Sequence, residues 1–569
     1  MVDKFLMIVL RRRFEAIIRE MTYALFKSGR SGVLNTAMDF SCSLTDAKFQ
    51  TISVALGIGT HVGSIELIPM SVASKHGESL RPGDCFAHND GYLGNTHCGD
   101  FTLCAPVFHG GRLCFYTIAR AHFADIGFPI PTTYHSTARD AYEEGMTFPC
   151  VRIQRDYKDI PEVIEICKAN IRAPEQFYGD YLACVAAVRT GERRLQELCD
   201  KYGVQVMEEF LDEYQDYAER MAMEAIARMP KGIATRTTYY DSTLPQYPTG
   251  IPITATVEVD PERKLITIDV TDNVDNVPLG INMTECTTLS TSRMVSLNVL
   301  GPDVPRCTGA FRRIDVKMRE GALIGKPKFP AATSCATTNV NHAFGSHLFT
   351  LFADISPNHG AAYGPSGLPG SCPVVSGVDP RNGNEPFVNQ VLLGAWAGPG
   401  VAGAEAWLSY CSPGAQGYPW QPSIELTEQQ QPMIIEEIGI RVDSGGAGEF
   451  QGGPGARVVF YAHLTPVRMI INSAAHDNPP QGVRGGFPGA PTRIWKQDLK
   501  GDLTDLGIDI DVTLQPGERL ISEGCGGGGY GDPAKRDPGK VSYHLREGWI
   551  TAAFAQRYYP MALAVTGEN

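Results

Sequence analysis

The chain has 569 residues, of which 43% are hydrophobic and 20% charged, and its formal net charge is −13. This composition is that of an ordinary folded protein, and the length exceeds what one hydrophobic core supports, so we expect several domains. The acidic balance argues against a nucleic-acid partner, because binding to phosphates needs a clustered basic surface.

Hydrophobic runs and cysteines indicate the compartment. No run approaches the ~18 apolar residues of a membrane span, and the six apolar residues 5–10 are too few for a secretory signal, so we expect no membrane association. The fifteen cysteines are odd in number and contain no Cys-x-x-Cys pair, which argues against a zinc ribbon or a thioredoxin-type site. We therefore expect a cytoplasmic protein whose reduced thiols pack as small hydrophobic groups.

The N-terminal 158 residues read as a mixed α/β region. Apolar residues at steps of three and four predict a helix that ends near Gly29, with one buried stripe: Leu10, Phe14, Ile17, Ile18, Met21 and Leu25. Short β-like runs follow, at 52–55, 101–108 and 113–118. The last two flank His109-Gly110-Gly111, which predicts a β-hairpin.

The rest of the chain divides into a helical and a β-rich part. Residues 159–230 read as helices, with Pro174 in a first turn and a break at Gly203. Residues 231–569 are rich in strands, Gly and Pro; they begin with a hairpin over 253–270 and include helices at 290–300 and 332–353. The sequence therefore predicts an α+β, multi-domain protein with a helical insertion between a mixed N-terminal region and a β-rich C-terminal half.

The residues best suited to chemistry lie within 83–127, where His-x-x-Asp occurs twice, as His97/Asp100 and His122/Asp125. On a tight turn, residues three apart can direct both side chains toward one ion. A histidine from the end of the next strand would complete a set that leaves positions for water or substrate. Imidazole and carboxylate together suit a divalent cation such as Zn or Mn, so His97, Asp100 and His122 are the candidate ligands.

Other interpretations of these residues remain open. Asp100 and Asp125 could accept hydrogen bonds from turn N–H groups, with the histidines as half-buried polar residues. A further carboxylate could move protons or support a ligating histidine, and Asp125 is the candidate for that catalytic role. Asp84 and Asp90 are alternatives, and the paired Glu143 and Glu144 are weaker ones.

Two further features are weaker candidates. Cys98, beside His97, could be activated as a nucleophile, although a structural role is favoured. The glycine-rich run 523–533 lets the backbone approach a ligand or form a compact turn, but no Lys-Ser/Thr follows it. Neither a P-loop nor a convincing Rossmann fingerprint occurs, so a nucleotide, if one is required, would be bound by another subunit.

Taken together, these motifs resemble the hydantoinase B/oxoprolinase family. Its signature is similar to Gly83-Asp-Cys-Phe through Asp100 and to Arg120-Ala-His-Phe-Ala-Asp-Ile-Gly. Further similarities, in the same order, cover nearly the whole chain: Asp39-Phe-Ser-Cys, Tyr142-Glu-Glu-Gly, Pro302-Asp-Val-Pro, Gly309-Ala-Phe-Arg-Arg-Ile, Gly445–Gly453 and Gly526–Pro533.

The resemblance implies a function and a partner. It implies that His97, Asp100 and His122 hold a divalent ion, as in related acetone carboxylases, and that Asp125 assists. It also implies a hetero-oligomer with a hydantoinase A-type subunit, which binds ATP-Mg and phosphorylates the carbonyl oxygen of the substrate. A metal-bound water on the present chain would then attack the activated cyclic amide.

Departures from the family pattern bear on the substrate. Asn89-Asp90-Gly91-Tyr92 replaces the usual Asn-Asp-Pro-Tyr, and Val33–Met38 lacks the charges common before Asp-Phe-Ser, which argues against hydantoin and 5-oxoproline themselves. We expect an ATP-dependent hydrolase of a cyclic amide (hydantoin-, lactam- or 5-oxoproline-like). A subunit of an ATP-dependent ketone carboxylase, like those for acetone and acetophenone, and a non-catalytic scaffold subunit are the alternatives.

Overall fold

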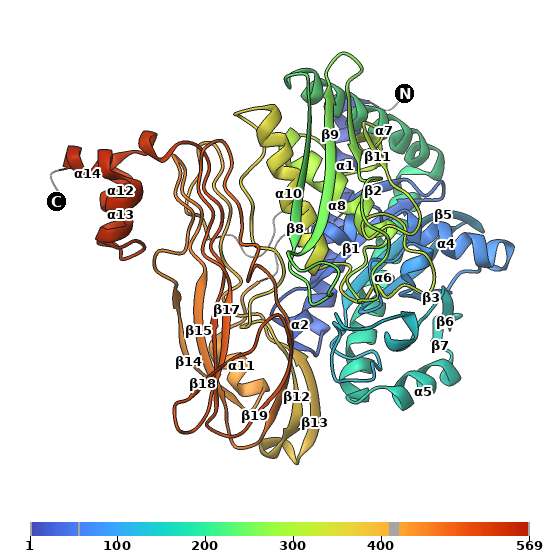
Figure 1. Cartoon of the computed structure of the whole chain (residues 1–569). Coiled ribbons are helices and arrows are strands. Elements are labelled where there is room, and N and C mark those ends of the chain that lie inside the picture. Colours follow the sequence, from blue (N-terminus) through green and yellow to red (C-terminus); the bar gives the residue numbers. More distant parts are fainter. Residues whose placement is uncertain (1–2, 55–56, 409–419, 567–569) are drawn as a thin grey trace. The chain divides into compact units, whose positions relative to one another are not determined.

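The computed structural model describes residues 3–54, 57–408 and 420–566, and the chain divides into two compact units (Figure 1). Unit 1 comprises residues 1–230, 259–268 and 275–337; unit 2 comprises residues 231–258, 269–274 and 338–569. Helices and antiparallel sheets occur together, so the predicted α+β, multi-domain fold class is confirmed. The division into 1–158, 159–230 and 231–569 stays a prediction.

Unit 1 is built on a seven-stranded sheet with the order β2-β1-β5-β4-β3-β6-β7. Every pairing described in it is antiparallel. The strands are β1 (Phe40–Asp46), β2 (Thr51–Val54), β3 (Cys85–His88), β4 (Asp100–His109), β5 (Arg112–His122), β6 (Val151–Arg155) and β7 (Lys158–Asp159). The predicted 52–55 strand thus corresponds to β2, while Ala55 lies outside the described residues.

Both faces of this sheet are buried. On β4 and β5, Phe101, Leu103, Phe115 and Ala119 join the core beneath α1 (Lys4–Ser28) and α6 (Pro174–Tyr202). Cys104, Tyr116 and Ile118 point the other way and pack with residues of α4 (Leu67–His76). Because side chains alternate along a strand, every second residue of β4 and β5 faces this second layer. Asp100, Thr102, Arg120 and His122 share that alternation with Cys104 and Ile118.

The N-terminal helix and the hairpin form as predicted. The six apolar residues of the α1 stripe are all buried, and the helix ends at Gly29. β4 and β5 are joined through Gly110 and Gly111, whose φ angles of 58° and 80° match a primed turn that favours glycine. Gly203, with φ 82°, separates α6 from α7 (Val204–Ala227), as the sequence predicts.

Five more helices and a second sheet lie within the described part of the first 340 residues. The helices are α2 (Gly32–Asn35), α3 (Gly59–Val62), α5 (Pro161–Asn170), α8 (Glu285–Leu300) and α9 (Thr308–Phe311). A second sheet has the order β11-β10-β9-β8, from β8 (Gly232–Tyr240), β9 (Ile251–Asp260), β10 (Leu265–Asp269) and β11 (Ile314–Lys317). Helix α8 starts earlier than predicted because Thr284 caps it in a capping box with Thr287.

Unit 2 contains two antiparallel sheets that share one core (Figure 1). One sheet has the order β13-β12-β16-β19 and the other β14-β15-β20-β17-β18. Their bounds are β12 (Val374–Asp379), β13 (Glu385–Gln390), β14 (Met433–Ile440), β15 (Ala456–Ala462), β16 (Val467–Asn472), β17 (Arg493–Gln497), β18 (Leu503–Asp505), β19 (Asp509–Leu514) and β20 (Arg519–Glu523). Inward residues such as Met469 and Phe460 interdigitate, as in a β-sandwich.

The helices of the C-terminal half differ from the sequence expectation. The predicted helix 332–353 begins only at Asn339 (α10, Asn339–Ile355), because 332–338 is an irregular segment. The β-rich region also ends in helices that the sequence did not predict. They are α12 (Pro538–Arg546), α13 (Ala552–Tyr558) and α14 (Pro560–Thr566), and α11 (Ile424–Gln430) precedes β14. Five 3-10 turns complete the described elements: η1 (Gly77–Ser79), η2 (Gly91–Leu93), η3 (Ala141–Glu143), η4 (Pro380–Asn382) and η5 (Pro533–Lys535).

The glycine-rich run near residue 526 packs backbone against backbone. A Cβ atom on Gly526 would lie 1.7 Å from the carbonyl oxygen of Ser444, and one on Gly452 would lie 1.9 Å from that of Gly527. No side chain fits at these contacts. The run therefore serves compact packing within unit 2, which is one of the two interpretations that the sequence left open.

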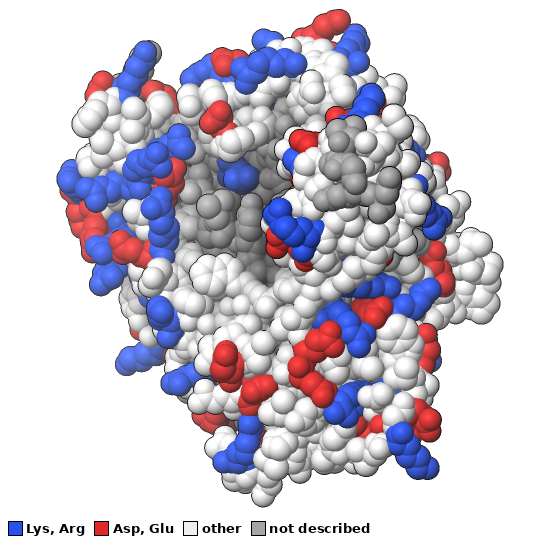
Figure 2. Space-filling view, turned by 90° about the vertical axis from the view of Figure 1, so that its left-hand side faces the viewer, with Lys and Arg blue, Asp and Glu red and all other residues white. Residues whose placement is uncertain are grey.

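Thiols are buried and surface charges are mixed. The fourteen cysteines within the described residues are all buried and none of them forms a disulfide, and Cys411 lies outside those residues. On the face shown in Figure 2, Lys and Arg are interspersed with Asp and Glu. Among the described helices, none is both long and apolar enough to cross a membrane.

Asp180 on α6 gives a pH-dependent test of the fold. Its carboxylate accepts N–H bonds from Arg30 (2.6 Å) and Ser31 (3.1 Å), and burial raises its pKa to about 6 from 3.8. A raised pKa in the folded state adds to the free energy of unfolding at pH values below the unfolded-state pKa. This contribution, about 3 kcal/mol, is lost as the pH rises through about 6. At each pH, the unfolding temperature of wild type is subtracted from that of Asp180→Asn. This difference should thus be more positive at pH 8 than at pH 4.

The measurement is thermal unfolding of both proteins across this pH range. Asp212→Asn, which removes an exposed carboxylate paired with Lys48, is the control and should show little change. A difference in unfolding temperature between Asp180→Asn and wild type that is the same at pH 4 and pH 8 would contradict the prediction.

Candidate metal centre

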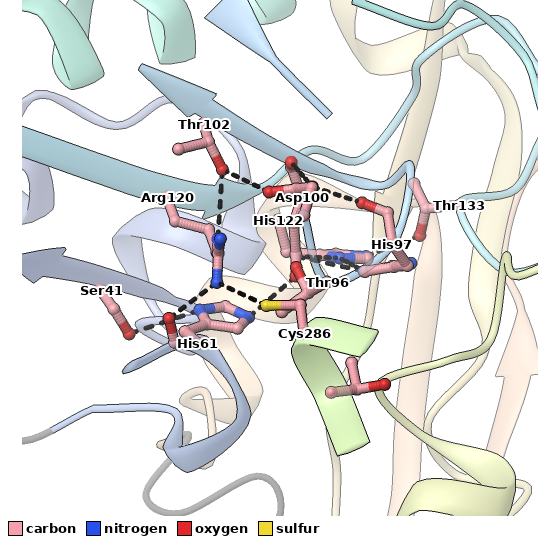
Figure 3. Close-up of polar contacts among 12 residues, drawn as sticks. Ser41, His61, Thr96, His97, Asp100, Thr102, Arg120, His122, Thr133 and Cys286 are labelled. Atoms are coloured by element: carbon pink, nitrogen blue, oxygen red, sulfur yellow. Dashed lines mark hydrogen bonds and ion pairs between the residues drawn. The ribbon is translucent and has the colours of Figure 1, made fainter. Parts of the chain in front are cut away.

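The two His-x-x-Asp motifs are brought together by strand register. Asp100, the first residue of β4, lies directly opposite His122, the last residue of β5. His97 reaches the same point from the turn before β4. Asp100 Oδ1 lies 3.1 Å from His97 Nε2 and 3.3 Å from His122 Nδ1, and the two nitrogens are 3.2 Å apart. All three side chains are buried (Figure 3).

Hydrogen bonds from the side chain of Asn95 hold the turn before β4. The buried Asn95 amide donates to the carbonyl oxygens of His97 (2.8 Å) and Asp100 (2.9 Å), and its own oxygen accepts from Thr102 Oγ1. Gly99 leaves the space that both imidazoles occupy, because a Cβ there would lie 2.7 Å from His97 Cε1 and 3.0 Å from His122 Cε1. The sequence His-Cys-Gly-Asp therefore suits a turn that holds two facing rings.

Each of the two rings has a hydrogen-bond partner on the side away from Asp100. His97 Nδ1 donates to the carbonyl oxygen of Ser334 at 2.7 Å, which leaves the Nε2 lone pair directed at Asp100 Oδ1. His122 Nε2 lies 2.7 Å from Thr133 Oγ1, which can accept from it; in the tautomer with hydrogen on Nε2, the Nδ1 lone pair faces the same point. Such outer hydrogen bonds set the tautomer and orientation of metal-ligating histidines.

The second oxygen of Asp100 is used by the protein. Asp100 Oδ2 accepts from His61 Nε2 at 3.1 Å and from the Thr96 hydroxyl, so only Oδ1 faces the two free nitrogens. Burial opposes the charge of Asp100, but the adjacent His61 and His97 outweigh it and hold the pKa of this carboxyl well below its usual value. Burial likewise lowers the pKa of His97, yet the Asp100 carboxylate more than offsets this and raises it.

Behind these ligands lies a second polar layer (Figure 3). His61, from α3, also bonds through Nδ1 to Ser41 Oγ of β1 at 3.3 Å. The fully buried Arg120 donates to the carbonyl oxygen of His61 at 2.7 Å and to Thr102 Oγ1 at 3.2 Å, and it lies 3.7 Å from Cys286 Sγ. Arg120 thus holds the backbone of the residue whose ring orients Asp100.

The ligand set fits a divalent ion. Atoms held about 2.0–2.2 Å from one ion lie about 2.9–3.4 Å from each other. The three separations, 3.1, 3.2 and 3.3 Å, fall in this range. Two neutral imidazole nitrogens and one carboxylate oxygen form a facial set suited to Zn²⁺ or Mn²⁺. The arrangement is therefore a candidate metal centre made entirely by unit 1.

Comparison with known proteins assigns the chain to a family. The hydantoinase B/oxoprolinase family model matches residues 3–533. The chain belongs to the hydantoinase B/oxoprolinase family. The family resemblance seen in the sequence is confirmed.

Three relatives of this family member are named after their reactions. The chain is 30% identical to the caprolactamase beta subunit of Pseudomonas jessenii, covering 100% of this chain and 97% of the relative. It is 26% identical to the B subunit of a putative D-/L-hydantoinase of Pseudomonas sp. (strain NS671), with 100% and 96% covered. It is also 26% identical to the acetophenone carboxylase delta subunit of Aromatoleum aromaticum, with 92% and 81% covered. Each of these relatives is named as one subunit.

Two solved structures share the fold. The ATP-dependent caprolactamase from Pseudomonas jessenii matches with a TM-score of 0.85 at 29% identity, covering 98% of this chain and 96% of that chain. Nucleotide-free acetone carboxylase matches with a TM-score of 0.88, covering 98% and 79%. At 16% identity, the second likeness concerns the fold alone.

The remaining candidate carboxylates have partners of their own. Asp125 accepts from Gly127 N (2.9 Å) and from Arg172 N (2.8 Å) and Nη1 (3.2 Å), so it anchors a turn. Asp84 accepts from Arg81 N, and Asp90 accepts from Tyr92 N at the start of η2. The catalytic role expected of Asp125 stays a prediction. The role of supporting the ligands falls in this structure to His61, Thr96, Thr133 and Ser334.

Of the other candidates, Cys98 is a buried thiol and Glu143 is a partly exposed carboxylate. Burial raises the pKa of the Cys98 thiol well above its usual value, which favours the unreactive protonated form. Glu143 forms a two-point ion pair with Arg139 at the surface. Glu144, by contrast, is buried and contacts Thr333 and Ser334.

His61 provides a test of how Asp100 is oriented. His61→Ala should lower the affinity of the purified chain for Zn²⁺ or Mn²⁺ by about 10–100-fold, because Asp100 Oδ2 loses a donor. Competition with a chromophoric chelator measures this affinity. His76→Ala, whose ring bonds instead to the carbonyl oxygen of Cys150, should bind the ion as wild type does. Equal affinities for the His61 variant and wild type would show that Asp100 is oriented without His61.

Proposed function

We propose that this chain is the metal-binding subunit of an ATP-dependent hydrolase of cyclic amides. The observation that carries the proposal is the convergence of two imidazole nitrogens and one carboxylate oxygen, with a hydrogen-bond partner on the far side of each group. The 30% identity to a caprolactamase subunit over the full length supports a lactam-like substrate. The 29% identical caprolactamase structure, described as ATP-dependent, supports the coupling to ATP.

The side chains of the centre have separate tasks. His97 and His122 present neutral nitrogens, and Asp100 contributes one negative charge that neutralises half of a divalent ion. A bound ion would supply a Lewis acid and lower the pKa of a water ligand toward ~7. His61, Thr96, Thr133 and the Ser334 carbonyl keep the ligands oriented, and the burial of all three ligands strengthens the local electrostatic interactions.

The ATP chemistry is assigned to a partner subunit. The sequence contains no P-loop, and the relatives are named as beta, B and delta subunits. We therefore assign ATP-Mg to a hydantoinase A-type subunit within a hetero-oligomer. Transfer of a phosphoryl group to the amide oxygen would make the carbonyl carbon more electrophilic, and the phosphorylated substrate would then be hydrolysed at the centre of the present chain.

A ketone carboxylase is the second candidate, because the acetophenone carboxylase delta subunit is a 26% identical relative. The two reactions differ in their co-substrate. With the partner present, a hydrolase turns over ATP with lactams or hydantoins and without bicarbonate. A carboxylase requires bicarbonate and a ketone, so a strict bicarbonate requirement would replace the proposed hydrolase with this alternative.

Removing a ligand tests the proposal and its scaffold alternative together. His122→Ala and Asp100→Asn should each lose the stoichiometric ion, with an affinity loss beyond the about 10–100-fold expected for supporting residues, and should lose substrate-dependent ATP turnover in the complex. Elemental analysis and ATP-turnover assays with lactams, hydantoins and ketones provide the two measurements.

His109→Ala is the matched control. This histidine lies at the β4–β5 turn and pairs with Asp200 at the surface, so its replacement should leave the ion content and turnover unchanged. If an intact complex containing His122→Ala turned over substrate at the wild-type rate, the chain would act as a scaffold and the proposal would be wrong.

A further inference from the structure

Glu144 is a buried carboxylate whose bonds go to one short stretch of backbone. Only 4% of the residue is exposed, and burial raises its pKa to about 7. Its Oε1 accepts the N–H groups of both Thr333 and Ser334, and its Oε2 lies 3.4 Å from Thr333 Oγ1. Burying a carboxylate costs free energy unless hydrogen bonds replace those that it made to water, so the contacts of Glu144 are of interest.

The stretch that Glu144 holds is the one that orients His97. The carbonyl oxygen of Ser334 accepts the Nδ1 hydrogen of His97 at 2.7 Å. Two other contacts fix the same stretch: Ser334 Oγ accepts from His135 N at 2.6 Å, and Cys335 N donates to the Gly280 carbonyl at 2.7 Å. We call residues 333–335 the strap. This strap belongs to the irregular segment that precedes α10.

A ligating histidine depends on the acceptor of its other nitrogen. If the Ser334 carbonyl moved away, His97 would lose the bond that keeps hydrogen on Nδ1 and the lone pair on Nε2. Glu144 accepts the N–H groups of Thr333 and Ser334, so it holds the two peptides that lead into the Ser334–Cys335 peptide. The carbonyl of that last peptide faces His97, and its own N–H bonds to Gly280.

We propose that Glu144 is a positioning residue of the metal centre, which acts by holding the strap so that the Ser334 carbonyl fixes the tautomer and orientation of His97. This inference rests on the proposed metal centre at His97, Asp100 and His122. It assigns to the second glutamate of Tyr142-Glu-Glu-Gly a task in the centre, and it leaves Glu143 outside.

Two substitutions of Glu144 separate the effect of side-chain length from the effect of its charge. Glu144→Gln keeps the length and one oxygen that can accept both N–H groups, and its NH₂ group faces Thr333 Oγ1, which can accept. Glu144→Asp keeps the charge but is one methylene shorter, so it cannot keep both bonds without movement of the strap. If Glu144 acts by position, Gln should preserve the centre and Asp should disturb it. If the charge matters, the order should be reversed.

The experiment uses the full-length purified chain, with Mn²⁺ and Zn²⁺ as probes in a chelator competition. Glu144→Asp and Glu144→Ala should bind each ion about 10–100-fold more weakly than wild type, and Glu144→Gln should bind within about threefold of wild type. With Co²⁺ as the bound ion, the visible absorption spectrum should change in Glu144→Asp and be retained in Glu144→Gln. Glu143→Gln is the matched control and should resemble wild type in both assays.

Hydrogen exchange at the amides of residues 333 and 334 provides a readout that needs no metal. Exchange in the metal-free chain should be faster in Glu144→Asp than in Glu144→Gln. Wild-type ion affinity in Glu144→Asp, or a Glu144→Gln variant that binds as weakly as Glu144→Ala, would overturn the inference while leaving the metal centre in place. If wild type bound neither ion, the proposed function would fail, and the exchange rates alone would decide whether Glu144 holds the strap.

Discussion

The site depends on one feature of the sheet, the pairing of Asp100 with His122 across β4 and β5. Because side chains alternate along strands, a shift of register by one residue would move one partner to the opposite face. The Gly110-Gly111 turn sets the pairing at one end of the hairpin, and a register shift between Val107 and Phe108 then places Asp100 opposite His122 at the other end. The hairpin that makes up the middle of the sheet is therefore also what aligns the ligands.

Around this pair, the two oxygens of Asp100 have separate partners, which helps to explain how a buried charge is tolerated in the core. Asp100 uses one oxygen for His61 and Thr96 and keeps the other for the two histidine nitrogens. An unpartnered buried polar group costs about 1–3 kcal/mol, so the supporting bonds stabilise the fold as well as the geometry. Glu144 has a similar role one step further from the centre. Its carboxylate stabilises the strap, which bonds to His97, rather than a ligand itself.

Much of this could be predicted from local sequence. The α1 stripe, the β4–β5 hairpin and the helix break at Gly203 follow from periodicity and from glycine conformation, and all are observed. The three candidate ligands were found because their residue types and spacing are distinctive. Contacts between residues far apart in sequence could not be found in this way. Ser334 meets His97 across 237 positions, and its contribution is a carbonyl group, which every residue possesses.

Two further differences have a similar cause. The helix predicted over 332–353 rests on an apolar pattern that starts only at Val340. The N–H groups of residues 333–335 bond to Glu144 and Gly280, and the helix begins at Asn339. His61 sits in a four-residue helix with no periodic signal, and nothing in the neighbouring sequence marks it as a partner of Asp100. Asp125, in contrast, repeats the motif of Asp100, yet its oxygens bind Arg172 and Gly127, because it lies beyond the end of β5.

The charges around the centre suggest which form of substrate it would favour. Asp100 is the carboxylate that faces the two histidine nitrogens, and burial raises the pKa of the neighbouring Asp39. Arg120 adds a fully buried positive charge behind His61. The charge of a divalent ion held by His97, Asp100 and His122, together with that of Arg120, would exceed the charge of Asp100. Such a field stabilises negative charge that develops on oxygen, as in the attack of water on an amide carbonyl, and it would do less for a substrate that stays neutral throughout.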